Sequence, residues 1–201
     1  MRVRKLGLVA YEPTWRAMQA FNQSRTPDTE DQIWMVEHPP VFTLGLAGRR
    51  EHVLDPGGIP VVATDRGGQV TYHGPGQAIA YTLLDLRRFG IGAKELVRRL
   101  EQAAIGTLAE YGVRGECRSG MPGVYVDGAK IAAVGLRIAR GCSYHGIALN
   151  VDVDLAPFGR IDPCGYPGLA ATRLADLGVR DSMETVQQRL ADSLVRCLTA
   201  N

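Results

Sequence analysis

The chain has 201 residues, little more than one typical domain uses, so we expect one domain over residues 1–201. Hydrophobic residues make up 45% of it and charged residues 22%, which is enough for a buried core and excludes a largely disordered chain. The 23 Lys and Arg against 21 Asp and Glu leave a net charge of +2, too small to argue for a nucleic acid as a partner.

The chain contains no run of 18 apolar residues, and its amino-terminal stretch lacks the apolar core of a secretory signal. We therefore expect no membrane segment and a cytoplasmic location. The four cysteines form no CxxC pair and the four histidines are scattered, so we expect neither a metal site nor a metal cofactor (Cys117, Cys142, Cys164, Cys197; His38, His52, His73, His145).

In chain order, hydrophobic periodicity first predicts a helix near residues 13–22, with Pro13 in its first turn and Trp15, Met18 and Phe21 facing inward. Strands are then expected at 33–37, 41–46, 69–73 and 78–84. A strongly amphipathic helix follows over residues 93–111, with Gly112 as its stop.

Further strands are expected at 123–126, 130–138 and 144–151, before a last helix over residues 181–198. Asp181 and Glu184 are spaced as a capping box for that helix, and its buried stripe is predicted to hold Met183, Val186, Leu190, Leu194 and Cys197. Because helices and strands do not alternate regularly, we predict an α+β fold in which a mixed, largely antiparallel sheet packs with helices.

Common nucleotide and hydrolase motifs do not fit. The run starting at Gly74 lacks the third glycine of a dinucleotide fingerprint, and the run ending at Lys130 is out of register with a phosphate-binding loop. A GxSxG nucleophile elbow is also missing from the sequence. These motifs therefore suggest no nucleotide or serine chemistry.

Three clusters combine reactive side chains with glycines. In the first, a Gly67-Gly68 turn leads into a short strand that ends in Tyr72, His73 and a second glycine-rich turn, where bare backbone can approach a ligand closely. The alternative is a hairpin with ordinary turn glycines.

The second cluster centres on Lys130, which enters an apolar strand in a chain whose usual cation is arginine. A desolvated lysine can lose its proton and arginine cannot, so lysine at this position suits proton transfer. The alternative is a lysine at a strand edge whose ammonium reaches water.

The third cluster runs from Tyr144 to Asn150 and is followed by Cys164, which lies between a proline and a glycine in a predicted loop. Such a loop could present a thiolate and a backbone N–H for an oxyanion. Most lone cysteines are inert, and His73 and His145 could equally be hydrogen-bonded histidines of a sheet.

The runs RGGQVTYHGPGQ, KIAAVG, HGIALNV and PCG occur in this order, and together they resemble the lipoyl(octanoyl) transferase family of lipoate biosynthesis. The similarity covers about residues 30–178. The resemblance implies the fold of biotin and lipoate protein ligase catalytic domains. It also implies transfer of an octanoyl group, without a cofactor, from octanoyl-acyl carrier protein through a cysteine thioester to a lysine of lipoyl domains.

Residue by residue, the resemblance implies that Cys164 carries the thioester and that Lys130 lowers its pKa. It implies an acyl site formed by three short segments (Arg66, Gly67, Gly68, Gln69, Val70, Thr71, Tyr72, His73; Ala133, Val134, Gly135; Gly146, Ile147, Ala148). The implied acceptors are lipoyl domains of 2-oxoacid dehydrogenase E2 subunits and the glycine cleavage H protein. The sequence departs from the family pattern at Tyr125, where many members have tryptophan, and at Arg173, where serine is commoner.

Two other functions remain open. An ATP-dependent lipoate–protein ligase of the same fold would need a nucleotide site and would give Cys164 no role, and an inactive acyl-binding module would not form a thioester. Residues 85–101 are the clearest basic stretch of the chain. This stretch is either a docking surface for an acidic partner or a solvated helix face.

Overall fold

The computed structural model describes residues 1–162 and 169–200. Within them, seven strands form one sheet in the order β1-β2-β6-β10-β9-β8-β7, and three more form a second sheet in the order β4-β3-β5. In the large sheet β1 pairs parallel to β2 and the other neighbours are antiparallel. The strands are β1 Arg2–Leu8, β2 Gln32–Glu37, β3 Val41–Leu44, β4 Val61–Ala63, β5 Val70–His73, β6 Gln77–Leu83, β7 Glu116–Arg118, β8 Met121–Val126, β9 Ala129–Ala139 and β10 Cys142–Asn150.

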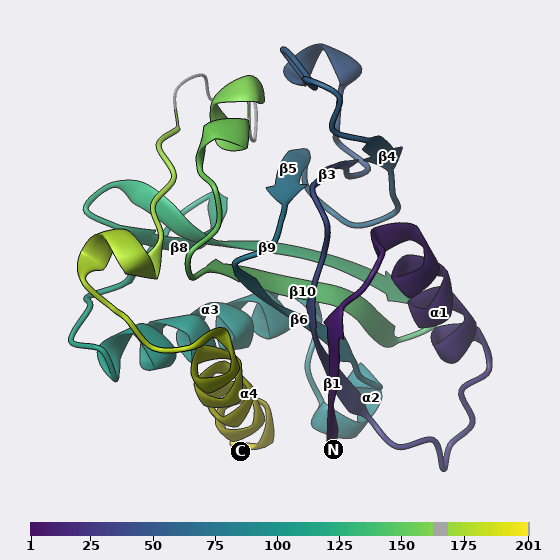
Figure 1. The fold of residues 1–201 in the computed structure, drawn as a ribbon. Coiled ribbons are helices and arrows are strands. Elements are labelled where there is room, and N and C mark those ends of the chain that lie inside the picture. Colours follow the sequence, from purple (N-terminus) through teal and green to yellow (C-terminus); the bar gives the residue numbers. More distant parts are fainter. Residues whose placement is uncertain (163–168, 201) are drawn as a thin grey trace.

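Helices cover the two faces of the large sheet unequally (Figure 1). Helices α2 (Leu86–Phe89), α3 (Ala93–Ala109) and α4 (Met183–Thr199) lie on one side, and α1 (Tyr11–Gln23) and the small sheet lie on the other. This arrangement confirms the predicted α+β fold with a mixed, largely antiparallel sheet.

The two long helices form where apolar residues recur at helical spacing, and both predictions are confirmed. Leu100 of α3 and Leu190 of α4 are fully buried between these helices and the sheet. The predicted cap of α4 is wrong: Ser182 is the N-cap, and its hydroxyl accepts a hydrogen bond from the Thr185 N–H at 3.2 Å. Serine is as good an N-cap as aspartate, so spacing alone could not decide between the two.

The helix predicted at 13–22 is confirmed as α1, which begins at Tyr11. Its first turn places Pro13 where no intrahelical N–H is needed. Met18 is fully buried beneath the helix, and Trp15 and Phe21 pack on the same cluster while partly exposed. Helix α1 therefore covers one half of the sheet face that also carries the small sheet.

Strands β1, β4 and β7 and helix α2 were not predicted from the sequence. Strand β1 is an edge strand whose side chains are almost all exposed, so it lacks the apolar alternation that marks a strand. Strands β4 and β7 have three residues each, and α2 has four. Across the described chain, the search for a helix long and apolar enough to cross a membrane gave none.

Candidate active site

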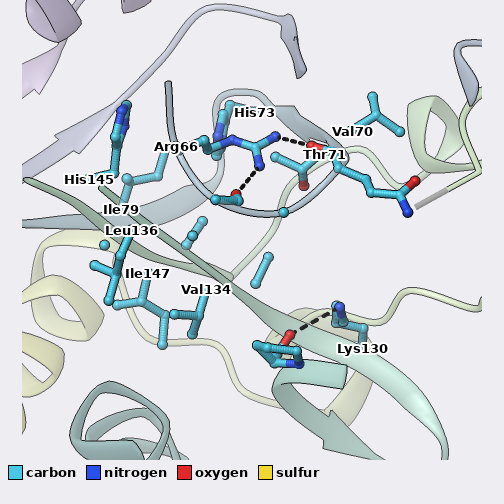
Figure 2. Close-up of a pocket in the computed structure, with 18 of the residues that line it drawn as sticks. Arg66, Val70, Thr71, His73, Ile79, Lys130, Val134, Leu136, His145 and Ile147 are labelled. Carbon is cyan, nitrogen blue, oxygen red and sulfur yellow. Dashed lines mark hydrogen bonds between the residues drawn. The ribbon is translucent and has the colours of Figure 1, made fainter. Parts of the chain in front are cut away.

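A cavity of about 460 Å³ lies between the large sheet and the small one. Its floor is the middle of β9 and β10, and its roof is the segment 66–71, which leads from the Gly67-Gly68 turn into β5. Figure 2 shows Lys130 on one side of this space and Arg66, Thr71 and His73 on another, with Val134, Leu136 and Ile147 close together on β9 and β10. A volume of this size suits a small ligand or an acyl chain.

Backbone hydrogen bonds hold the roof in place from two sides. The N–H groups of Leu46 and Ala47 donate to the carbonyls of Arg66 and Gly68 at 2.9 and 3.1 Å. On the other side, the N–H of Gly67 donates to the carbonyl of Leu136 on β9 at 2.7 Å. Gly68 has φ of +84°, a conformation open to glycine at no steric cost, so the Gly-Gly pair is needed for this turn.

Arg66 is a buried cation that braces the roof from within. Its guanidinium donates to the hydroxyl and carbonyl of Thr43 on β3 and to the carbonyls of Gly67 and Gln69, at 2.7 to 3.1 Å. Arg66 is 7% exposed, and a buried charge without such partners would cost several kcal/mol. The arginine therefore fixes the loop that contains it.

Gly135 and Gly146 lie in the floor of the cavity, and a larger side chain is excluded at each for a different reason. A methyl group at Gly146 would lie 2.0 Å from the carbonyl oxygen of Ala80, so this glycine lets β10 pack against β6. A methyl group at Gly135 would instead meet the roof, 3.2 Å from the Gly67 oxygen. Only Gly135 is therefore small because of the cavity itself.

Asp65, next to Arg66, joins three parts of the fold. Its carboxylate accepts hydrogen bonds from Trp15 (2.8 Å) and Gln19 (3.0 Å) of α1, from Nε2–H of His145 (3.0 Å), and from the hydroxyl of Tyr144. Burial alone would raise its pKa, but these four donors outweigh burial and hold the pKa of Asp65 well below its usual range. Asp65 therefore ties the roof segment to α1 and β10 as a permanent anion.

Tyr144 and His145 can both reach Asp65 because His145 has φ of +60°. Successive side chains of a regular strand point to opposite faces, and this left-handed residue interrupts the alternation. The two rings stack with centroids 5.1 Å apart. Burial lowers the pKa of His145 despite the neighbouring carboxylate, so the ring is neutral. A non-glycine residue in this conformation is typical of functional sites.

A second buried chain of polar side chains runs along the cavity. His73 Nδ1 donates to the amide oxygen of Gln77 at 3.0 Å, and the Gln77 amide nitrogen donates to Asn150 at 3.0 Å. Asn150 in turn donates to the carbonyl of Thr172 at 2.9 Å. Burial lowers the pKa of His73 to about 3, helped by His38 and Arg66, so His73 is neutral and presents its Nε2 lone pair.

His38 lies behind this chain and is fully buried. One ring nitrogen contacts the Val9 carbonyl at 2.6 Å and the other the Tyr81 hydroxyl at 2.7 Å. Burial lowers the pKa of His38 to about 4, and burial raises the pKa of Tyr11, which stacks on His73, to about 12. The histidine and tyrosine rings on this side of the cavity are thus polar but uncharged.

Lys130 lies at the start of β9, half-buried at the cavity. Its Nζ donates to the carbonyl of Pro122 at 3.3 Å and lies 5.2 Å from the centre of the Tyr125 ring. Its backbone N–H donates to Ala170 at 2.8 Å, and its carbonyl accepts from Thr172 at 3.0 Å. The segment that follows Cys164 in sequence is therefore paired to the strand at Lys130 itself.

The cavity brings together Lys130 and every residue predicted for the acyl site except Tyr72. The ring of Tyr72 packs on Phe42 and Phe158, with centroids 5.5 Å away in each case, and so supports the small sheet from behind. Cys164 lies outside the described residues. Around the cavity, sequence reasoning missed Tyr11, Asp65, Gln77, Tyr81 and Asn150. Gln77 and Asn150 stand within the glycine-rich runs that drew attention to the site, and Tyr11 and Asp65 carry no comparable signal.

The chain matches the family model described as the lipoyl protein ligase A/B catalytic domain over residues 10–195. It is 61% identical over 200 residues to an octanoyltransferase of Alkalilimnicola ehrlichii, covering 100% of this chain and 92% of that protein. It is also 61% identical over 196 residues to an octanoyltransferase of Thiobacillus denitrificans, covering 98% and 90% of the two chains.

Two solved structures share the fold at low sequence identity. A lipoate-protein ligase A bound with ATP superposes with a TM-score of 0.79 at 16% identity, covering 98% of this chain and 86% of that one. The biotin protein ligase of Aquifex aeolicus superposes with a TM-score of 0.57 at 13% identity, covering 98% and 69%. These two likenesses show the fold, and the family match and the two relatives show that the chain belongs to the lipoyl(octanoyl) transferase family, enzymes built on the lipoyl protein ligase A/B catalytic domain.

Proposed function

We propose that the enzyme takes an octanoyl group from octanoyl-acyl carrier protein, holds it as a thioester on Cys164, and passes it to a lysine of a lipoyl domain. The observation that carries this proposal is the pairing of Lys130 with Ala170 and Thr172. Ala170 follows Cys164 by six residues, and both it and Lys130 line the cavity. The residues that follow Cys164 in sequence are thus paired with Lys130, which supports a role for both Cys164 and Lys130 in one reaction.

In the first step the Cys164 thiolate attacks the carbonyl carbon of the donor thioester, and the bond from that carbon to the carrier sulfur breaks. The carrier leaves as a thiolate and takes a proton from the Lys130 ammonium. A nearby cation favours the thiolate form of Cys164 in the free enzyme. The products of this step are an octanoyl-enzyme, the carrier thiol and a neutral Lys130 amine.

In the second step the neutral amine of Lys130 takes a proton from the incoming lysine, whose nitrogen attacks the octanoyl carbonyl. The bond to Cys164 breaks, an amide forms, and Cys164 leaves as the thiolate with which the cycle began. Both acyl donors are thioesters of similar energy, so the exchange needs no ATP. The acceptors we propose are lipoyl domains of E2 subunits and the glycine cleavage H protein.

The lining of the cavity supports an alkyl chain as its occupant. Ile79, Val134, Ile147 and Ala148 line it, and each methylene that they bury is worth roughly 0.8 kcal/mol. We further propose that the enzyme works in the cytoplasm, together with its donor, octanoyl-acyl carrier protein. The three described cysteines carry no disulfide, which suits a reducing compartment.

The test is the intact mass of the enzyme after incubation with octanoyl-acyl carrier protein and no ATP. We expect one added octanoyl group, its absence in Cys164→Ser, and its persistence in the three matched variants Cys117→Ser, Cys142→Ser and Cys197→Ser. Full transfer to a lipoyl domain by Cys164→Ser would overturn the mechanism. Acylation that requires ATP and a free acid would favour a ligase, and binding without acylation would favour an inactive acyl-binding module.

A further inference from the structure

The cavity narrows where its roof meets β9. At Leu136 the two are joined by the hydrogen bond from the Gly67 N–H, 2.7 Å long. One residue earlier, at Gly135, a methyl group would already be 3.2 Å from the Gly67 oxygen, which is closer than ordinary van der Waals contact. On this face of the sheet the cavity therefore narrows at Gly135, between Lys130 at one end of its β9 lining and Arg137 and Ile138 at the other.

The side chain of Arg66 forms one side of this constriction. A methyl group at Gly135 would lie 3.3 Å from Cδ of Arg66 and 3.6 Å from its Nη1, so the arginine stem lies directly over the glycine. Because the guanidinium donates to Thr43, Gly67 and Gln69 at once, the stem has one fixed position (Figure 2). Because Arg66 is a fixed wall, the space for a chain between Lys130 and Gly135 has a defined length.

Thr43 holds that wall from outside the cavity. It is fully buried on β3 and does not belong to the cavity lining, yet its hydroxyl accepts from Nε of Arg66 at 3.1 Å and from Nη2 at 2.9 Å. Its carbonyl accepts from Nη2 at 2.7 Å. The hydroxyl is thus a side-chain acceptor for the guanidinium, and its removal acts on the cavity through Arg66 without changing a lining residue.

We propose that the contact of Arg66 and Gly67 with Gly135 and Leu136 sets the length of acyl chain that the enzyme accepts, and that Thr43 is the positioning residue that fixes this length. The proposal deepens the octanoyl transfer proposed above, because it assumes that the acyl chain lies along β9 with its carbonyl at the Lys130 end. Thr43 then determines specificity without contacting the substrate.

The first test is Thr43→Val, which keeps the shape of the side chain and removes the hydroxyl. Hexanoyl, octanoyl and decanoyl carriers compete for Cys164, and the products are counted by intact mass. We expect the ratio of decanoyl to octanoyl product to rise about fourfold to fifteenfold, the value of one or two newly buried methylenes. Thr43→Ser restores the hydroxyl and should restore the wild-type ratio.

The matched control is Thr107→Val, an equally buried threonine of α3 that lies away from the cavity. Its hydroxyl bonds only to its own helix, so the chain-length ratio should stay at the wild-type value. A merely structural effect of losing a buried hydroxyl would lower the stability of both valine variants and move neither ratio.

The second test works in the opposite direction. Gly135→Ala adds one methyl group against Arg66 at a residue whose φ is not left-handed. We expect the product ratio to shift toward hexanoyl by about fourfold. This variant tests the wall even if Thr43→Val does not fold.

The outcomes separate this proposal from the proposed function. If wild-type enzyme gains no octanoyl group on Cys164, the proposed function is wrong. If it does, and if folded Thr43→Val and Gly135→Ala both keep the wild-type chain-length ratios, the wall is elsewhere and this inference is wrong. If only Gly135→Ala shifts the chain-length ratio, the wall is confirmed and Thr43 does not position it.

Discussion

The two faces of the large sheet are built from different kinds of residue. The face under α3 and α4 has a core cluster of 24 buried apolar residues, and the two helices also bury the polar side chains of Glu101, Thr107, Gln187 and Ser193. The opposite face, under α1 and the small sheet, buries His38, His73, His145, Tyr81 and Arg66 beside its apolar residues. One sheet therefore separates a mainly apolar core from a region that must keep histidine, tyrosine and arginine side chains in fixed positions.

The difference teaches where stability and chemistry lie in this fold. Buried polar groups are costly unless every hydrogen bond is made, and an apolar core tolerates small changes of shape. The polar face meets that cost through Asp65 with four donors and through Arg66 with its donors to Thr43, Gly67 and Gln69. Variants on the two faces should consequently fail in different ways.

The largest expected effect is on activity, from Lys130→Arg. Arginine keeps the charge but cannot give up its proton, so transfer to the acceptor should fall by about 10²–10⁴-fold while the fold is retained. The measurement is single-turnover transfer from octanoyl-enzyme, with Lys94→Arg on the exposed start of α3 as the matched control. Turnover near that of wild type would reduce Lys130 to electrostatic support of the thiolate.

The next effect is on stability, from Leu100→Ala under the sheet. Leu100 is fully buried, so the variant should lose about 2–5 kcal/mol of unfolding free energy in a denaturant titration. Activity per folded molecule should not change, because Leu100 does not itself line the cavity. A parallel loss of specific activity would break the division between the two faces.

A graded effect on stability, absent at neutral pH, is expected from acidification. His38 and His73 have pKa values lowered by burial to about 4 and about 3, against about 6.5 for an exposed histidine. Below pH 6.5 the unfolded chain binds protons that the folded chain does not, so stability is full above that pH. It should fall by about 1.4 kcal/mol per pH unit for each histidine as the pH drops toward 4.

Unfolding titrations at pH 7, 6 and 5 measure this slope. The variant His38→Gln can still form hydrogen bonds to Val9 and Tyr81. It should remove the part of the pH dependence of the unfolding free energy that is due to one histidine. A free energy of unfolding that stays constant between pH 7 and pH 5 would mean that these rings titrate normally and that the polar face is open to water.

The smallest effect is expected from Arg98→Glu in the basic stretch 85–101. Arg98 and Arg99 both bond to Glu95, Arg99 also donates to the Leu198 carbonyl, and Arg87 bonds to Asp85. These pairs favour a solvated helix face, so KM for the carrier should change by less than about twofold. A strong increase in KM that depends on salt would instead identify this stretch as the docking surface.

Local sequence predicted the regular parts of the fold well, because α3 and α4 bury one continuous stripe and the central strands are buried along their whole length. It failed at β1, where the backbone pairs with β2 although the side chains remain in water. The cap of α4 shows a similar limit, since Asp181 and Ser182 are adjacent and both suit the position.

The sequence predicted the parts of the candidate site that lie in glycine-containing segments, and it missed the others. Arg66 to Thr71 and Ala133 to Gly135 were expected at a common site and do line one cavity. Asp65 was not expected, because its four donors come from α1 and β10, which are far from it in sequence and meet only in the fold. The same holds for Thr43, which has no feature of its own in the sequence.

The attachment of Lys130 to Ala170 and Thr172 uses only backbone atoms, and this has a practical consequence. The position of this residue does not depend on its side chain, so the side chain can be removed without releasing the strand from its neighbour. Lys130→Ala is therefore suited to chemical rescue, in which small primary amines diffuse into the vacated space. The dependence of the recovered rate on the basicity of each amine would then report how far the proton has moved in the transition state.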